Sequence, residues 1–76
     1  MKVLDPVATG QNIKTLMRSK GKTANDVMLA CDLSTRNAVY RWFQGRPMPT
    51  LDHVVILADL LEVAVDEIII TMEVDV

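Results

Sequence analysis

The chain has 76 residues, of which 50% are hydrophobic, 24% are charged and three are aromatic. This length fits one small domain, and the composition is too apolar for a disordered chain. No apolar run approaches the roughly 20 residues of a membrane span, and the first residues lack the apolar stretch of a secretory signal. The single cysteine, Cys31, excludes an internal disulfide and a cysteine-based zinc site, so we expect a cytoplasmic protein.

The net charge is −2, but the charges are unevenly distributed along the chain. Residues 1–46 contain all eight basic residues and three acids, which gives +5, whereas residues 47–76 contain seven acids and no Lys or Arg, which gives −7. Such an asymmetry lets an anionic polymer meet a basic face of an acidic protein. On charge alone, an accidental distribution of solvated charges explains the pattern equally well.

Glycine and proline divide the chain into segments that read as five short helices. The first is expected to run from a cap at Asp5–Pro6 to Gly21. The second starts at Thr23, which forms a pair with Asp26 that resembles a capping box. Apolar side chains at helical spacing mark the expected core faces of these two helices: Ile13, Leu16, Met17, Val27, Ala30 and Cys31.

Three further helices are expected after the second. Ser34 or Thr35 caps the third, which Gly45 ends as a left-handed C-terminal cap. Thr50 caps the fourth, and Asp66 leads a short fifth. The residues of the last two helices that we expect to point inward are Leu51, Val54, Leu57, Ala58, Leu61, Ile68 and Ile69.

The last residues have a strand-like composition. The stretch from Ile68 onward is β-branched, and residues 73–76 alternate polar with apolar side chains. This pattern allows a short strand that pairs with residues 2–4 of the same or another subunit. The expected fold class is therefore all-α, a single five-helix domain over residues 1–76, with its core at 8–70, a tail at 71–76 and the option of short terminal β-strands.

The third helix has two chemically distinct faces. With about 100° between successive residues, one face is wholly apolar, and the other carries polar or basic residues and no acid. Arginine reads guanine edges, and asparagine or glutamine reads adenine edges. A merely solvated face normally mixes lysine with glutamate, so the pattern favours DNA recognition. The outward residues are Arg36, Asn37, Tyr40, Arg41 and Gln44.

Five short segments carry a resemblance to a known family: Gln11–Lys14, Lys20–Thr23, Val39–Trp42 with Gly45, Leu51–Asp52 and Val65–Ile69. They make the run from Gly10 to Ile70 similar to the helix-turn-helix domain of phage repressors and Cro, often called XRE-like. Dimers of that family bind paired half-sites with the third helix in the major groove. The resemblance implies a repressor-type transcriptional regulator that binds double-stranded DNA of specific sequence as a homodimer at the nucleoid.

The resemblance also implies roles for single residues. Four residues are expected to approach base edges: Thr35, Arg36, Asn37 and Arg41. Four are expected to contact phosphates, with the backbone of Thr23 included: Lys22, Thr23, Gln44 and Arg46. No enzyme activity, cofactor or metal is expected, because His53 has no second ligand at metal spacing, and no phosphate-binding glycine loop or suitable carboxylate pair is present. The five methionines and Cys31 are interpreted as core residues.

Several positions depart from the family pattern. Ala24 replaces a glutamine that follows the cap of the second helix, which removes one phosphate contact. Asp32 replaces the turn glycine, and aspartate tolerates a left-handed backbone better than most residues, though less well than glycine. The larger Met28 and one extra residue before Val39 together indicate a slightly wider turn. Hydrophobic residues replace both members of a buried ion pair, an exchange that can be neutral or stabilising. These two residues, Met17 and Phe43, are therefore expected to touch.

The sequence leaves open the dimer contact and an alternative function. One reading helix gives little affinity, and a chain of this length has no room for a separate dimerisation domain, so pairing is expected through the fifth helix and the tail, with residues 68–70 as the natural contact. An alternative function keeps the fold without DNA, as a protein-interaction module (an antitoxin-like or regulator-docking subunit) whose protein partner binds the acidic, apolar C-terminal half. The missing glutamine and the acidic total favour this alternative, and the acid-free face of the third helix disfavours it.

Overall fold

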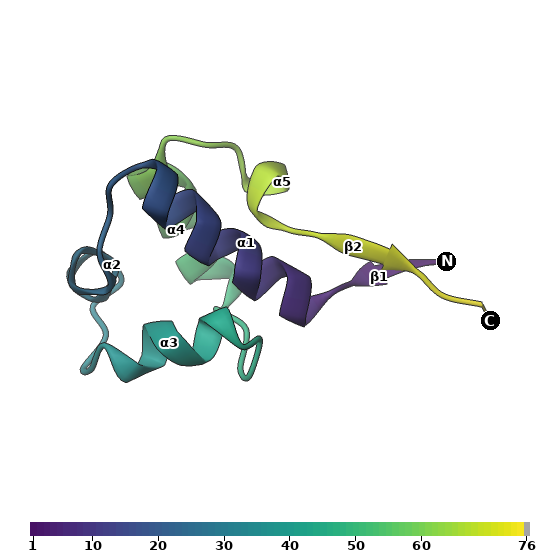
Figure 1. Cartoon of the computed structure of the whole chain (residues 1–76), viewed down its shortest axis with the longest axis horizontal. Coiled ribbons are helices and arrows are strands. Elements are labelled where there is room, and N and C mark those ends of the chain that lie inside the picture. The colour runs from purple at the N-terminus through teal and green to yellow at the C-terminus, as the bar shows by residue number, and fades with distance from the viewer. Residues whose placement is uncertain (76) are drawn as a thin grey trace.

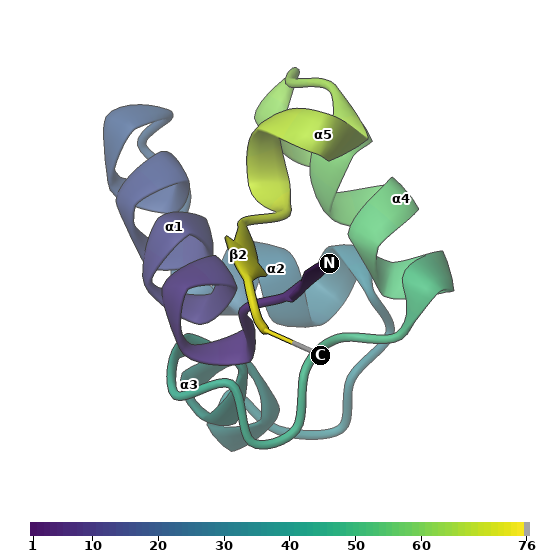
Figure 2. The ribbon, with the colours of Figure 1, turned by 90° about the vertical axis from the view of Figure 1, so that its right-hand side faces the viewer.

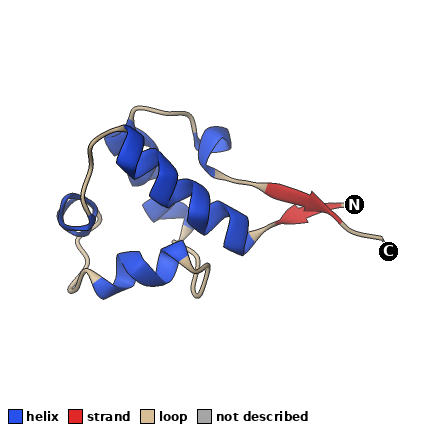
Figure 3. Cartoon of the chain, viewed as in Figure 1, coloured by secondary structure: helices blue, strands red, loops and turns tan. Residues whose placement is uncertain are grey.

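A computed structural model describes residues 1–75 (Figure 1). In that part of the chain, five helices form the body and two short strands project from it (Figure 3). The all-α, five-helix fold with short terminal strands is confirmed, although α5 starts one residue earlier than predicted. The elements are β1 (Lys2–Leu4), α1 (Pro6–Ser19), α2 (Ala24–Ala30), α3 (Asn37–Phe43), α4 (Leu51–Leu61), α5 (Val65–Ile68) and β2 (Thr71–Glu73).

Three helices begin at the capping residues that the sequence predicts. The Asp5 Oδ1 atom accepts a hydrogen bond from the backbone N–H of Ala8 at 3.0 Å, at the start of α1. At the start of α2, Thr23 and Asp26 form a complete capping box, in which each side chain accepts a hydrogen bond from the other's backbone N–H. Thr50 caps α4 with its side chain. These bonds satisfy N–H groups that the first turn of a helix leaves free.

The predicted cap of α3 is wrong. Neither Ser34 nor Thr35 caps the helix, because the residue before it is Arg36, whose φ of −69° and ψ of −21° are already helical. A capping side chain requires an extended backbone at that position. Both hydroxyl residues are exposed instead. The end of α3 is as predicted, since Gly45 follows it with φ 73°.

One hydrophobic core lies between the helices. α1 packs against α3 and α5, and α2 packs against α3 and α4. Two residues predicted to point inward, Ala30 and Leu51, are exposed, because they are the last residue of α2 and the first of α4, where each helix leaves the core. Met1 and Met72 are also exposed, so the methionines fill the core only in part. The core residues are Ile13, Met17, Val27, Cys31, Val39, Trp42, Val54, Leu57, Ala58, Leu61 and Ile68.

The two strands pair antiparallel within the chain, with Val3 opposite Met72. β2 begins two residues earlier than the alternation at 73–76 predicts, and the last position of that predicted strand lies outside the described residues. The buried Thr9 of α1 fixes the base of the ribbon, because its Oγ1 atom donates to the carbonyl of Ile70 at 3.3 Å and accepts from the N–H of Ile70 at 3.0 Å. Ile68 is fully buried in the core, so it cannot make the expected subunit contact.

Candidate nucleic-acid interface

α3 presents a polar face to solvent, as the helical pattern predicts. Val39 is fully buried and Trp42 almost fully, while Ala38 and Phe43 are half-buried. Two views at right angles place α3 on one side of the molecule and α5 on the opposite side (Figures 1 and 2). All five outward residues are exposed: Arg36, Asn37, Tyr40, Arg41 and Gln44.

Close packing against α1 fixes the C-terminal end of α3. A Cβ atom at Gly10 would stand 2.7 Å from the carbonyl oxygen of Phe43, and closer still to the carbonyl oxygen of Trp42. One residue later, Gln11 Nε2 donates a hydrogen bond to the Phe43 carbonyl at 3.1 Å. This bond satisfies a carbonyl that the end of a helix leaves without a partner. The exposed face of α3 is therefore held in a defined orientation.

Three of the four predicted base-reading residues line one open hollow. The hollow has a volume of about 450 Å³ and lies between α2 and the start of α3. Thr35, Arg36 and Asn37 line it together with Tyr40. Arg41 does not line it, but it is exposed four residues after Asn37, which places both on the same side of α3. The hollow therefore joins most of the predicted base-reading set into one surface.

The predicted phosphate-binding residues lie at the two ends of the α2–α3 unit. Lys22 and Thr23 precede α2, while Gln44 and Arg46 follow α3. Lys22 is half-buried and the other three are exposed. The backbone N–H of Thr23 donates to the Asp26 carboxylate at 2.8 Å in the free chain. The phosphate contacts of Lys22, Thr23 with its backbone, Gln44 and Arg46 stay predictions.

Asp26 has a lowered pKa in this capping box. The backbone hydrogen bond from Thr23 lowers it most, followed by the side-chain bond with Thr23. Hydrogen bonds donated to a carboxylate favour its charged form. The start of α2 therefore carries a negative charge at neutral pH beside the basic residues of the interface.

A second hollow gathers three cations that lie far enough apart in the sequence not to suggest one site. It has a volume of about 240 Å³ and is lined by Lys14 and Arg18 of α1 and by Lys22, which precedes α2. Met17 and Phe43 lie in the same lining, so they share one side of the molecule, while their direct contact stays a prediction. The Nζ atom of Lys14 is 5.9 Å from the centre of the Phe43 ring. The four-residue spacing of Lys14 and Arg18 indicates that both lie on one face of α1, but only the fold shows that this face lies beside α3.

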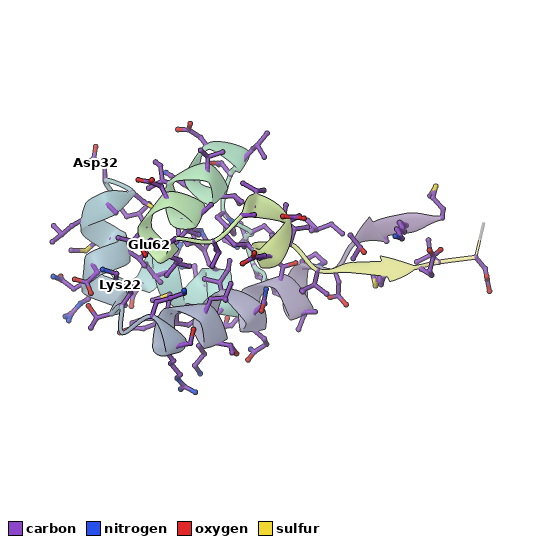
Figure 4. All side chains as sticks on the ribbon, turned by 90° about the horizontal axis from the view of Figure 1, so that it is seen from above. Lys22, Asp32 and Glu62 are labelled. Atoms are coloured by element: carbon purple, nitrogen blue, oxygen red, sulfur yellow. The ribbon has the colours of Figure 1, made fainter. Side chains whose placement is uncertain are left out.

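The turn between α2 and α3 follows the expectation for an aspartate in place of glycine. Asp32 has φ 54°, in the left-handed region that aspartate tolerates better than most residues. Lys22 and Asp32 lie at opposite ends of α2, and Glu62, which is also left-handed, follows α4 (Figure 4).

The acids of residues 47–75 are all exposed: Asp52, Asp59, Glu62, Asp66, Glu67, Glu73 and Asp75.

The other two residues with reactive side chains, His53 and Cys31, are at least half-buried. The half-buried His53 ring lies 5.4 Å from the ring of Trp42. Burial raises the pKa of the Cys31 thiol. Residues 1–75 contain no group of three His, Cys, Asp or Glu side chains that could hold a metal ion. No helix in this part of the chain is long and apolar enough to span a membrane.

The helix-turn-helix family model matches residues 13–68, from the middle of α1 to the end of α5. The chain belongs to the helix-turn-helix family. The resemblance to the helix-turn-helix domain of DNA-binding regulators is thereby confirmed, and the matched range contains α2 and α3 in full.

A solved structure agrees with this helix-turn-helix fold. The crystal structure of the restriction-modification controller protein C.AhdI from Aeromonas hydrophila is similar, with a TM-score of 0.74 and 25% sequence identity. The similarity covers 84% of this chain and 96% of that chain. Among curated protein sequences, none matches this chain significantly.

Proposed function

We propose that this helix-turn-helix protein is a repressor-type transcriptional regulator that binds specific double-stranded DNA sequences as a homodimer, with α3 in the major groove. The exposed face of α3 carries the proposal, because its five outward residues include two arginines, an asparagine and a glutamine without an acid. These residue types match the donor and acceptor patterns of base edges. The similarity to a controller protein supports a regulatory role. The proposed DNA partner implies a location at the nucleoid, in the cytoplasm.

Phosphate contacts would flank the reading face on both sides. Lys22, the hydroxyl of Thr23, Gln44 and Arg46 lie at the ends of the α2–α3 unit. We add Lys14 and Arg18 to this set, because they line the basic hollow beside Phe43 of α3. Contacts of this kind fix the register of a protein on the duplex, whereas base contacts supply the specificity.

Substitution of the two arginines of the reading face tests the proposal directly. We expect Arg36→Ala or Arg41→Ala to weaken binding to the cognate site by about 1–3 kcal/mol, because each removes one bidentate contact to a base pair. The loss is confined to cognate DNA and relaxes specificity at one position. Fluorescence anisotropy with cognate and random duplexes measures both affinities.

Arg46→Ala is the matched control, because it removes the same side-chain type from the end of the motif. We expect it to weaken binding to all sequences alike and to reduce the salt dependence by about one phosphate contact. Equal losses on cognate and random DNA for Arg36→Ala and Arg41→Ala would show that these residues do not read bases.

One observation favours a second function on the same fold. Leu51 and Val55 are 73% and 54% exposed, and they lie one turn apart on α4 beside the exposed Asp52 and Asp59. This surface suits a protein partner, as in an antitoxin-like or regulator-docking subunit. A chain with this role alone would retain no duplex DNA even at low salt.

A further inference from the structure

The ribbon of β1 and β2 has outer edges with unpaired backbone groups. Backbone hydrogen bonds join Met1 with Val74 and Asp5 with Ile70. Antiparallel pairs alternate between hydrogen-bonded and non-hydrogen-bonded positions, so two residues of β2, Thr71 and Glu73, are of the second kind. Their N–H and C=O groups point away from β1.

Such a ribbon is an incomplete sheet. Two strands of three residues are marginal in water, and an open edge is a template for another strand. We propose that the outer edge of β2 pairs antiparallel with β2 of a second copy of this chain, around a twofold axis at Met72. The proposal rests on the proposed homodimer and names its interface, which replaces the contact expected at the buried Ile68.

The side chains of β2 suit this pairing. Thr71 would face Glu73 of the second copy, and Met72 would face its own counterpart, so no like charges stand directly opposite each other. Val3 and Met72 lie opposite each other in the ribbon, and the pairing would extend them into a row of four apolar residues. Met72 is 42% exposed in the single chain, and this row would cover it.

The other edge is less suitable. Pairing of β1 with β1 would place Lys2 opposite Leu4 of the second copy, which sets a charge against an apolar side chain. Lysine on an edge strand is also a common protection against pairing with other chains. The sequence therefore favours β2 as the open edge.

The orientation of the ribbon fits a dimer that binds one DNA molecule. The strands nearly overlap in Figure 1 and lie side by side in the view from above in Figure 4, so one face of the ribbon is turned upward in Figure 1. A twofold axis between antiparallel strands is perpendicular to the sheet. α3 lies below the ribbon in Figure 1, so this axis would leave both copies of α3 on the same side of the dimer.

Proline at position 73 tests the edge without breaking the ribbon. Glu73→Pro removes one outward N–H, whereas Glu73→Ala keeps that N–H and removes the same carboxylate, which pairs with the N-terminal ammonium at 3.1 Å. Sedimentation equilibrium should give similar dimer dissociation constants for wild type and Glu73→Ala. We expect an increase of about tenfold to thirtyfold for Glu73→Pro, because a symmetric interface loses two hydrogen bonds. Equal constants for the two variants would overturn the proposal, as would a wild-type chain that stays monomeric.

Two more variants keep the test decisive. Lys2→Pro removes an outward N–H from β1, and a loss as large as that of Glu73→Pro would assign the interface to β1 and overturn the proposal. If circular dichroism shows that Glu73→Pro does not fold, Met72→Lys takes its place, with Met72→Gln as its control. Both variants replace the apolar side chain by a polar one, but only the lysine brings two like charges together at the twofold axis. Retention of the dimer in Met72→Lys would then contradict the proposal.

Binding to a duplex with a single half-site separates this proposal from the proposed function. Glu73→Pro should bind that duplex as well as wild type does. If Glu73→Pro weakens the dimer but the wild-type protein binds no DNA, the ribbon interface is supported and the proposed function is refuted. If the protein binds DNA as a dimer and the Glu73 and Met72 variants do not weaken that dimer, the proposed function is supported and the ribbon interface is refuted.

Discussion

Asp26 illustrates, at the scale of a single residue, how a local bond couples stability to pH. Its hydrogen bonds with Thr23 lower its pKa below the ordinary 3.8. A carboxyl whose pKa is lower in the folded state stabilises the fold above its unfolded pKa. This stabilisation is lost as the pH falls through the lowered, folded pKa.

We therefore expect Asp26→Asn to lower the melting temperature at pH 7, and we expect the difference from wild type to shrink below about pH 4, where the wild-type carboxyl is progressively protonated. Thermal unfolding followed by circular dichroism at pH 7 and at pH 2.5–3 (about one unit below the ordinary pKa) measures this. Asp59→Asn is the control, because Asp59 is likewise an exposed acid but lies inside α4, where it caps no helix. A difference for Asp26→Asn that is equal at both pH values would contradict the account.

Single residues also show what the sequence could predict. The caps at Asp5, Thr23 and Thr50 depend on a side chain and a backbone N–H three residues away, so they are visible locally. Leu51 follows the same apolar spacing as its neighbours on α4 but lies at the end of the helix, beyond the core. Spacing gives the direction of a side chain, whereas burial also depends on what stands opposite, which the sequence does not contain.

At the scale of elements, the contact between α1 and α3 determines how the reading face is held. We expect Gly10→Ala to destabilise the fold by about 1–3 kcal/mol, because its Cβ would meet carbonyl oxygens of α3 that cannot move without shifting the helix. Gln11→Ala should cost about 0.5–1.5 kcal/mol through the lost hydrogen bond to Phe43. Urea denaturation measures both losses.

Thr15→Ala serves as control for the α1 variants, because Thr15 is exposed on the same helix and bonds only within it. We expect its effect to stay within about 0.5 kcal/mol. A loss for Gly10→Ala no larger than that of Thr15→Ala would show that the contact between α1 and α3 does not constrain the reading helix.

Elements defined by distant contacts were the hardest to predict. The alternation at residues 73–76 indicates a strand, but its position is decided by bonds of Ile70 to Thr9 and Asp5, more than 60 residues away in the chain. The start of α3 is similar, because Arg36 is helical without any capping side chain. The two faces of α3, in contrast, follow from helical periodicity alone.

At the scale of the whole molecule, the fold converts the uneven charge distribution into a spatial one. The sequence showed +5 in residues 1–46 and −7 in residues 47–76. The structure places the reading face and the hollow of Lys14, Arg18 and Lys22 around α3, while α5 with Asp66 and Glu67 lies on the opposite side (Figure 2). A net charge of −2 is therefore compatible with DNA binding through one face.

The central claim is that this protein reads DNA through the exposed face of α3. Selection from a pool of random duplexes, at low and at moderate salt, tests this claim most directly. We predict retention that weakens steeply with salt and enrichment of a sequence with two half-sites about 34–36 Å apart, and we predict that the double variant Arg36→Ala, Arg41→Ala loses the enrichment. Failure of the wild-type protein to retain any duplex at low salt would contradict the account, as would the same enrichment by the double variant.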